Sequence, residues 1–304
     1  MTITTRNEIE PMKKHFLVTI SNDTENLYGA RFACSFFNSS SEHALTLLHI
    51  CRLDSSDMEK ALTEMWKDPD DDLQERISFG AKRSIEKSRQ LLNGCSFSID
   101  QVITKTVAER YGKVKDILTE GEQGLYDAII LGRRATYALQ WMFEKPGDEV
   151  AHAMIRENCC SSPLWICPEL EPGRKNVLLC VDGSEDSYRA VDHVGYILAD
   201  QDHHAVTLFH VENGVRSDAG ELFVKAERIL NEHGIGGERI KRENSWGLTV
   251  SGAILSESAR GGYAAVAVGL HGQEHGLLKE FNLAGGTTAK LISRIEKAAL
   301  WCCP

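Results

Sequence analysis

Residues 176–190 read Asn-Val-Leu-Leu-Cys-Val-Asp-Gly-Ser-Glu-Asp-Ser-Tyr-Arg-Ala. The apolar run from Asn176 to Val181 predicts a short strand in a parallel sheet that is covered on both faces. A polar turn, Asp182-Gly-Ser-Glu185, ends the strand, and a helical stripe follows at Ala190, Val191, Val194, Ile197 and Leu198. Open α/β sheets place ligands at such turns, although Asp182 and Glu185 also fit a plain capping box.

The same arrangement occurs twice along the chain. The matching pairs are Asn22–Ala30 with Asp182–Ala190, Leu45–Ile50 with Val206–Val211, Asp127–Gly132 with Ala264–Gly269, and Leu164–Pro168 with Leu300–Pro304. Their order is kept, so we predict a tandem repeat of one α/β domain. The first copy covers residues 13–168, the second copy covers 174–304, and a Pro- and Gly-containing linker joins them. The first copy is longer because it carries an insertion at about 52–72.

Each copy is predicted to be a Rossmann-like, flavodoxin-like domain. Strands alternate with helices over short connections, which indicates a parallel sheet of five strands flanked by helices. The last strand of each copy, at 164–167 and at 300–303, is short and apolar and would be an exposed sheet edge in an isolated domain. Because pairing removes such edges, we expect these strands to be adjacent in an internal dimer with pseudo-twofold symmetry.

Composition excludes several classes of protein. A length of 304 residues suits two domains, and the net charge of -10 argues against nucleic-acid binding. The chain has no apolar run of about 20 residues and no apolar segment near its start, so we expect no membrane span, no signal peptide and a cytoplasmic location.

The cysteines suggest a reducing compartment. Their number is nine, which is odd, and no Cys-x-x-Cys pair occurs, so a disulfide framework is not expected. The vicinal pairs Cys159-Cys160 and Cys302-Cys303 could bind a soft metal or be redox-active, but burial as small apolar groups is favoured. The repeated His49 and His210 are predicted to be hydrogen-bonded histidines within buried strands.

The end of the second copy contains a candidate phosphate turn. Its fourth strand runs into Gly269-Leu-His-Gly272, and Gly285-Gly-Thr-Thr288 opens the last helix. Glycines let the backbone approach a ligand, and free amides with a hydroxyl at a helix N-terminus attract an anion. His271 and His275 are therefore expected beside a phosphate rather than on a metal ion.

These motifs, taken together, resemble the universal stress proteins, the UspA-like family, over about residues 13–167 and 175–303. The resemblance implies a Rossmann-like fold, dimerisation through the last strand and, in one subclass, an ATP site. It assigns Asp182 to the adenosine, Val211 to the adenine, and Gly269, Gly272, Gly286 and Thr287 to the phosphate turn, with His271, Gly285 and Thr288 beside them. The spacing departs from the family pattern, because thirteen residues rather than nine separate Gly272 from Gly286.

The first copy departs further from the pattern. Asn22 replaces the acidic residue, Ala135 replaces the second glycine, and Asp148 in the following turn would repel a phosphate. We therefore expect a degenerate site there and one adenine nucleotide, ATP or AMP with or without Mg²⁺, in the second copy.

The function that the resemblance implies is that of a nucleotide-binding stress-response or regulatory protein. No catalytic set is repeated in the two copies, so no catalytic residue is assigned and at most weak ATP hydrolysis is expected. Two alternatives remain. One is a scaffold or interaction protein of the same fold that binds no nucleotide; an unidentified protein partner and a homodimer are left open under either function. The other is an ATP-cleaving enzyme with a pyrophosphate loop. Residues 182–187 bear a superficial resemblance to the signature of that loop.

Overall fold

The computed structural model describes residues 13–38, 42–52, 78–95, 97–132, 162–212, 218–270 and 287–304. The elements of the first copy are β1 (His15–Thr19), α1 (Tyr28–Phe36), β2 (Ala44–Cys51), α4 (Phe79–Asn93), a 3₁₀ turn (Ile99–Gln101), β3 (Val102–Ala108), α5 (Lys113–Gln123), β4 (Ala128–Gly132) and β5 (Leu164–Cys167). Most of the predicted insertion, Ala135, Asp148 and Cys159-Cys160 lie outside the described residues.

The second copy repeats this order. Its elements are β6 (Lys175–Cys180), α8 (Glu185–Leu198), β7 (Val206–Glu212), α9 (Ala219–Glu232), a 3₁₀ turn (Gly237–Arg239), β8 (Ile240–Trp246), α10 (Val250–Gly261), β9 (Tyr263–Gly269), α11 (Thr287–Arg294) and β10 (Ala299–Cys303). The predicted strand at the start of the second copy is β6, and the predicted helical stripe faces inward on α8, where all five residues are buried.

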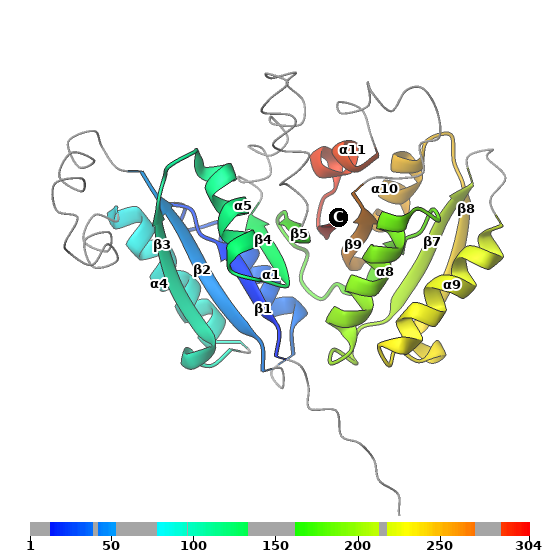
Figure 1. The fold of residues 1–304 in the computed structure, drawn as a ribbon, viewed down its shortest axis with the longest axis horizontal. Coiled ribbons are helices and arrows are strands. Elements are labelled where there is room, and N and C mark those ends of the chain that lie inside the picture. Colours follow the sequence, from blue (N-terminus) through cyan, green and yellow to red (C-terminus); the bar gives the residue numbers. More distant parts are fainter. Residues whose placement is uncertain are drawn as a thin grey trace, which may run out of the picture.

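The described strands form one sheet of ten, in the order β3-β2-β1-β4-β5-β10-β9-β6-β7-β8. Pairs within each copy are parallel, whereas β5 and β10 pair antiparallel with Trp165 opposite Trp301. The predicted five-stranded copies and their internal pairing through the last strands are thus confirmed. Figure 1 shows the two copies side by side with β5 and β10 at the centre.

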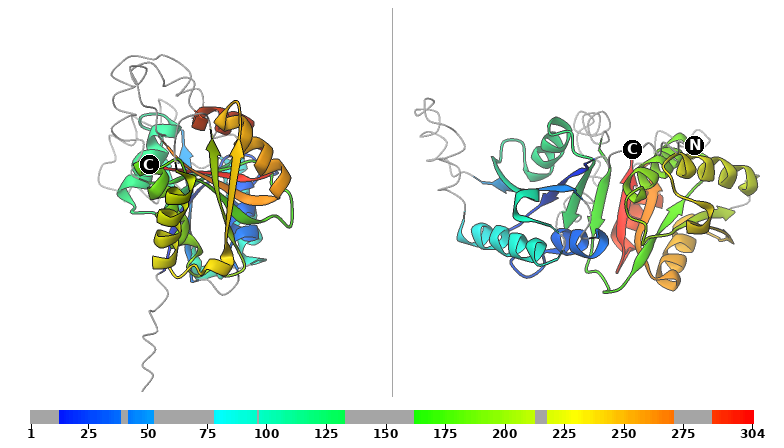
Figure 2. Two further views of the ribbon diagram at one scale, coloured as in Figure 1. Left: turned by 90° about the vertical axis from the view of Figure 1, so that its right-hand side faces the viewer. Right: turned by 90° about the horizontal axis from the view of Figure 1, so that it is seen from below.

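Helices cover both faces of the sheet, as the second view in Figure 2 shows. α1, α4, α8 and α9 pack on one face, and α5, α10 and α11 pack on the other. The connections explain this division: the first two helices of each copy lead outward along the sheet, and the later ones lead back across its other side. The helices of the described ranges are too short or too polar for any of them to span a bilayer.

An aromatic cluster joins the two copies at the centre of the face that α1, α4, α8 and α9 cover. The fully buried rings of Trp165 and Trp301 stack with their centroids 4.0 Å apart and their planes 5° from parallel. Trp165 Nε1 donates a hydrogen bond to His193 Nε2 of α8 over 3.1 Å. Phe36 at the end of α1 stacks on His204 of the second copy at 4.3 Å. Because aromatic pairs add about 0.5–1.5 kcal/mol beyond their buried area, the cluster stabilises the pairing of the copies.

The buried histidines in the strands have the roles predicted for them. The Nδ1 atoms of His49 and His210 lie 3.0 and 2.8 Å from the carbonyl oxygens of Ile20 and Val181, at the ends of the neighbouring strands. Burial lowers the pKa of His49, which favours the neutral ring.

The cysteines require one correction. Cys34 of α1 and Cys95, which follows the C-cap Gly94 of α4, form a disulfide bond across 61 residues. The expectation that the chain lacks a disulfide framework missed this bond because no local motif marks either cysteine, and only the packing of α1 on α4 brings them together. Cys302 and Cys303 are buried in β10, as predicted.

We predict that the structure loses stability in mild acid. His204 Nδ1 accepts a hydrogen bond from the Asn176 amide (3.0 Å), so the proton lies on Nε2, which donates to the Phe36 carbonyl (2.9 Å). Burial lowers the pKa of His204 to about 4 and that of His193 to about 3. The unfolded chain, with histidine pKa values near 6.5, therefore binds more protons, and stability falls as the pH drops from about 6.5 toward 4.

Urea unfolding at pH 7.5 and 4.5 measures this loss, which should be on the order of 2–3 kcal/mol for His204 alone. His204→Gln should be less stable than the wild type at pH 7.5 but should lose less on acidification. An equal loss in both proteins would contradict this role of His204.

Candidate functional site

The sheet register brings three predicted site residues to one edge. Cys180 of β6 lies opposite Phe209 of β7. Asp182 follows Cys180 by two residues and Val211 follows Phe209 by two, so these two positions are at the same level of the sheet. On the other side, Leu179 lies opposite Ala267 of β9, two residues before Gly269. Asp182 follows the end of β6, Val211 is the second-last residue of β7, and Gly269 is the last residue of β9, so all three lie at the carboxyl ends of neighbouring parallel strands. The helices after β6 and β9 leave this edge on opposite faces, which is the topological switch point where α/β sheets bind ligands.

Asp182 orders the turn between β6 and α8. Its Oδ1 accepts hydrogen bonds from the amide of Ser184 (2.9 Å) and from its hydroxyl (2.6 Å). Gly183 has a φ of +86°, a conformation that suits glycine. The capping-box expectation was wrong in detail, because the N-cap of α8 is Ser184, whose side chain accepts from the Ser187 amide, while the Glu185 side chain is 90% exposed. The carboxylate therefore stays at the strand end, above the edge of the sheet.

Gly269 is required by the packing of β9 against α8. A Cβ atom at this position would lie 2.6 Å from the carbonyl carbon of Asp186 and from the amide nitrogen of Ser187. These are backbone atoms of the first turn of α8, which cannot move aside as a flexible side chain could. The close approach of β9 to α8 thus needs glycine at this position, a reason that the sequence pattern did not reveal.

The start of α11 lies beside the end of β9. The helix begins at Thr287, and the Thr288 hydroxyl is 3.4 Å from the carbonyl oxygens of both Gly269 and Leu270. The first amides of α11 therefore lie near the same edge as Asp182 and Val211. The predicted site residues His271, Gly272, Gly285 and Gly286 lie outside the described residues.

The corresponding turn of the first copy is built differently. Asn22 is exposed, and the next residue, Asp23, accepts hydrogen bonds from the amides of Glu25 and Asn26 (3.0 and 3.3 Å). The first turn of α4 lies close by, since a Cβ atom on Gly80 would be 3.4 Å from the Asn22 carbonyl oxygen. The acidic side chain of this copy is thus engaged by its own turn, one residue beyond the position of Asp182.

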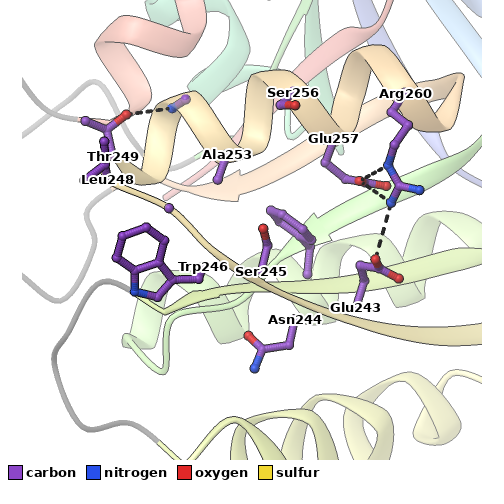
Figure 3. A pocket seen from close by; sticks show the side chains of 13 residues that line it. Glu243, Asn244, Ser245, Trp246, Leu248, Thr249, Ala253, Ser256, Glu257 and Arg260 are labelled. Atoms are coloured by element: carbon purple, nitrogen blue, oxygen red, sulfur yellow. Dashed lines mark hydrogen bonds and ion pairs between the residues drawn. The ribbon is translucent and has the colours of Figure 1, made fainter.

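A groove that sequence reasoning missed lies between β8 and α10 (Figure 3). It has a volume of about 510 Å³, with Phe209 of β7 among its lining residues and the small residues Gly252, Ala253 and Ser256 on its helical wall. Arg260 closes one end by donating to Glu257 (2.9 Å), and it pairs with Glu243 at 3.3 Å.

The other end of the groove adjoins the candidate site. A Cβ atom on Gly247, in the loop after β8, would be 3.6 Å from Val211 Cγ1. The loop after β8 therefore packs against the residue that the family resemblance assigns to the adenine. Its next residue, Leu248, is 90% exposed.

A buried tyrosine–glutamate pair occurs in both copies. Tyr126 OH donates to Glu120 (3.1 Å) in the first copy, and Tyr263 OH donates to Glu257 (2.9 Å) in the second copy. Burial raises the pKa of Tyr126 to about 12. The spacing of six residues is the same in both copies and could have been found by aligning them. Because the pair occurs at the same place in both copies, it is assigned to the stability of the fold. The described residues do not gather three or more His, Cys, Asp or Glu side chains into a potential metal-binding group.

The fold and this edge define a duplicated, doubly wound α/β protein with a candidate ligand site in its second copy. No protein-family model and no curated protein sequence matches the chain. Among solved structures, it is similar to a universal stress protein from Archaeoglobus fulgidus, at 16% identity and a TM-score of 0.59, over 95% of each chain.

Two further structures are similar. A functionally unknown protein from Pseudomonas aeruginosa matches at 15% identity and a TM-score of 0.50, over 96% of this chain and 92% of that one. A universal stress protein in complex with cAMP matches 43% of this chain and 96% of its own length, at 19% identity and a TM-score of 0.35. The chain thus has the tandem form of the universal stress protein fold.

We predict that Gly269→Ala destabilises the protein by about 1–3 kcal/mol, because its Cβ atom would overlap the backbone of α8. Gly132→Ala is the matched control at the equivalent end of β4, where an added Cβ atom has no described neighbour within 4 Å. Urea unfolding at pH 7.5 compares the two variants. Equal stability of the variants would show that Gly269 is not needed for packing.

Proposed function

We propose that this chain is a stress-response or regulatory protein that binds one adenine nucleotide, ATP or AMP, in its second copy. The observation that carries the proposal is the convergence of Asp182, Val211 and the first turn of α11 at the carboxyl edge of β6, β7 and β9. Such an edge is where ligands bind in open α/β sheets.

The adenosine end of the proposed site would rest on Asp182 and Val211. A carboxylate held at a strand end by two hydrogen bonds from Ser184 is oriented before the ligand arrives, so little conformational freedom is lost on binding a ribose hydroxyl. Val211 is largely buried and would offer an apolar surface for the base, and Gly247 packs next to it, where an added Cβ atom would be 3.0 Å from Ala253 Cβ and 3.6 Å from Val211 Cγ1. The groove beyond Gly247 could admit a substituent on the base.

The phosphate end would rest on the start of α11. Amides in the first turn of a helix have no partner within the helix and carry a partial positive charge, which attracts phosphate. Thr287 and Thr288 lie at this start, and the backbone of Gly269, Gly272, Gly285 and Gly286, with His271, would complete the phosphate turn. When present, Mg²⁺ would neutralise phosphate charge.

The difference between the two copies supports a single site. The second copy has its acidic residue at the strand end, whereas the first copy has Asn22 there and uses Asp23 within the turn. The proposed stoichiometry is one nucleotide per chain. A scaffold that binds no nucleotide is the second candidate, because strands of the chain itself complete the continuous ten-stranded sheet.

Isothermal titration of ligand-stripped protein with ATP and AMP tests the proposal. Asp182→Asn should weaken binding by about 1–3 kcal/mol, because it removes a charge-assisted hydrogen bond while an amide oxygen can still accept from Ser184. Gly272→Val should abolish binding by occupying the space through which the phosphates approach. Asn22→Ala, at the matched position of the first copy, is the control and should bind like the wild type.

Four results would count against the proposal. Two equivalent sites per chain, or unchanged affinity in Gly272→Val, would contradict the placement in the second copy. Absence of binding would favour the scaffold, and release of AMP and pyrophosphate from ATP would favour an ATP-cleaving enzyme.

A further inference from the structure

The disulfide between Cys34 and Cys95 fastens two helices of the first copy. Cys34 lies in α1, two residues before Phe36, and Cys95 lies one residue beyond the C-cap of α4. The bond therefore ties the end of α4 to the helix that reaches the junction of the two copies.

The second copy makes the corresponding contact without a covalent bond. At the end of α9, His233 takes the place of Cys95, and its Nε2 lies 2.8 Å from Asp192 Oδ1 of α8. Gly195 of α8 packs directly beneath the His233 ring, because a Cβ atom on Gly195 would be 2.5 Å from Cδ2. The corresponding pair of helices is thus joined by a disulfide bond in the first copy and by a side-chain contact in the second copy. The fold therefore does not require a disulfide at this point.

The bond is open to small molecules from the side of Cys95. Cys95 is exposed at the end of its helix, whereas Cys34 is half-buried. The remaining thiols of the described residues lie deeper: burial raises the pKa values of Cys167, Cys180 and Cys303, which keeps them protonated and poor nucleophiles. Thiol exchange is therefore directed to Cys95 among the described cysteines.

α1 connects this bond to the second copy. The carbonyl oxygen of Phe36 lies 3.1 Å from His203 Nε2 and 2.9 Å from His204 Nε2. Two residues further on, the Asn38 amide donates to Gln201 Oε1 over 3.0 Å. The end of α1 that follows Cys34 therefore contacts the second copy at residues 201–204.

We propose that Cys34 and Cys95 form a reversible thiol-modification site that exchanges with low-molecular-weight thiols such as glutathione and thereby sets the rigidity of α1 and α4. A thiolate attacks Cys95 Sγ, a mixed disulfide forms there, and Cys34 leaves as a thiolate that takes up a proton. A second thiolate attacks the sulfur of the small thiol, and Cys95 leaves in the same way. Two protein thiols and one small-molecule disulfide result, and the reverse steps re-form the bond.

The site is independent of the proposed nucleotide site. Neither cysteine lies at the carboxyl edge of the second copy, and exchange at Cys95 requires no nucleotide. If no thiol exchange is found, the nucleotide proposal is unchanged. If no nucleotide binds, the proposal of thiol exchange is likewise unchanged.

The first test equilibrates the full-length protein in buffers of glutathione and glutathione disulfide, removes the small thiols by rapid gel filtration, and labels the free thiols of the native protein with N-ethylmaleimide at neutral pH. Mass spectrometry of the peptides should find Cys34 and Cys95 labelled together, as a single two-electron transition, while Cys167 and Cys303 stay unlabelled in the native protein. If the pair stays unlabelled in excess glutathione until the protein is unfolded, or if glutathione is found on Cys34 while Cys95 is labelled, the proposal is wrong.

The second test measures hydrogen–deuterium exchange of the oxidised and reduced protein. Amides of α1 and α4 should exchange at least severalfold faster after reduction, while α8 and α9 serve as the internal control and stay unchanged. Cys95→Ser should match the reduced protein and no longer respond to glutathione. His233→Gln, at the matched position of the second copy, should loosen α8 and α9 in both redox states. Identical exchange of α1 and α4 before and after reduction would overturn the proposed effect on rigidity.

Discussion

The antiparallel pairing of β5 with β10 is the contact on which the rest of the molecule depends. Each of these strands would end its own five-stranded sheet with unpaired backbone groups, and joining them satisfies both edges at once. The stacked rings of Trp165 and Trp301 lie directly on this junction, so hydrogen bonding and aromatic packing act at the same place. The edges that remain are β3 and β8, and β8 carries the charged run Lys241-Arg242-Glu243, a common protection of edge strands against further pairing.

Away from the junction of β5 with β10, the two copies use different side-chain contacts at equivalent positions. The buried glutamate of α5 pairs with Lys105 of the edge strand, whereas its counterpart in α10 pairs with Arg260 of its own helix. The two helices that share one face of each copy are joined by a disulfide in the first copy (α1 and α4) and by His233 with Asp192 in the second copy (α8 and α9). Different chemistry at equivalent positions gives the two halves different sensitivities to their surroundings, although their backbones follow one plan.

The fold could be predicted from the sequence because its strongest signals are local or repeated. Buried parallel strands are near-continuous apolar runs, and the recurrence of Leu-Trp-x-Cys identified the two edges that had to meet. The missed features depend on contacts between distant segments. No sequence motif near Cys34 indicates that it pairs with Cys95. The need for glycine at 269 comes from the backbone of α8, more than 80 residues earlier in the chain. The groove beside β8 depends on small residues of α10 that carry no pattern of their own.

The predicted site residues differ in how strongly they indicate a ligand site, because some of them are also needed for packing. Gly269 is demanded by its contact with α8, so its presence says little about phosphate. Asp182 is different. It stabilises its turn through Ser184, but the first copy stabilises the equivalent turn with Asp23, one residue later, and keeps an amide at the strand end. An acid at either position can thus order the backbone of the turn. The carboxylate at the strand end, level with Val211 and near the start of α11, therefore distinguishes the second copy from the first, and it is the feature on which the proposed nucleotide site rests.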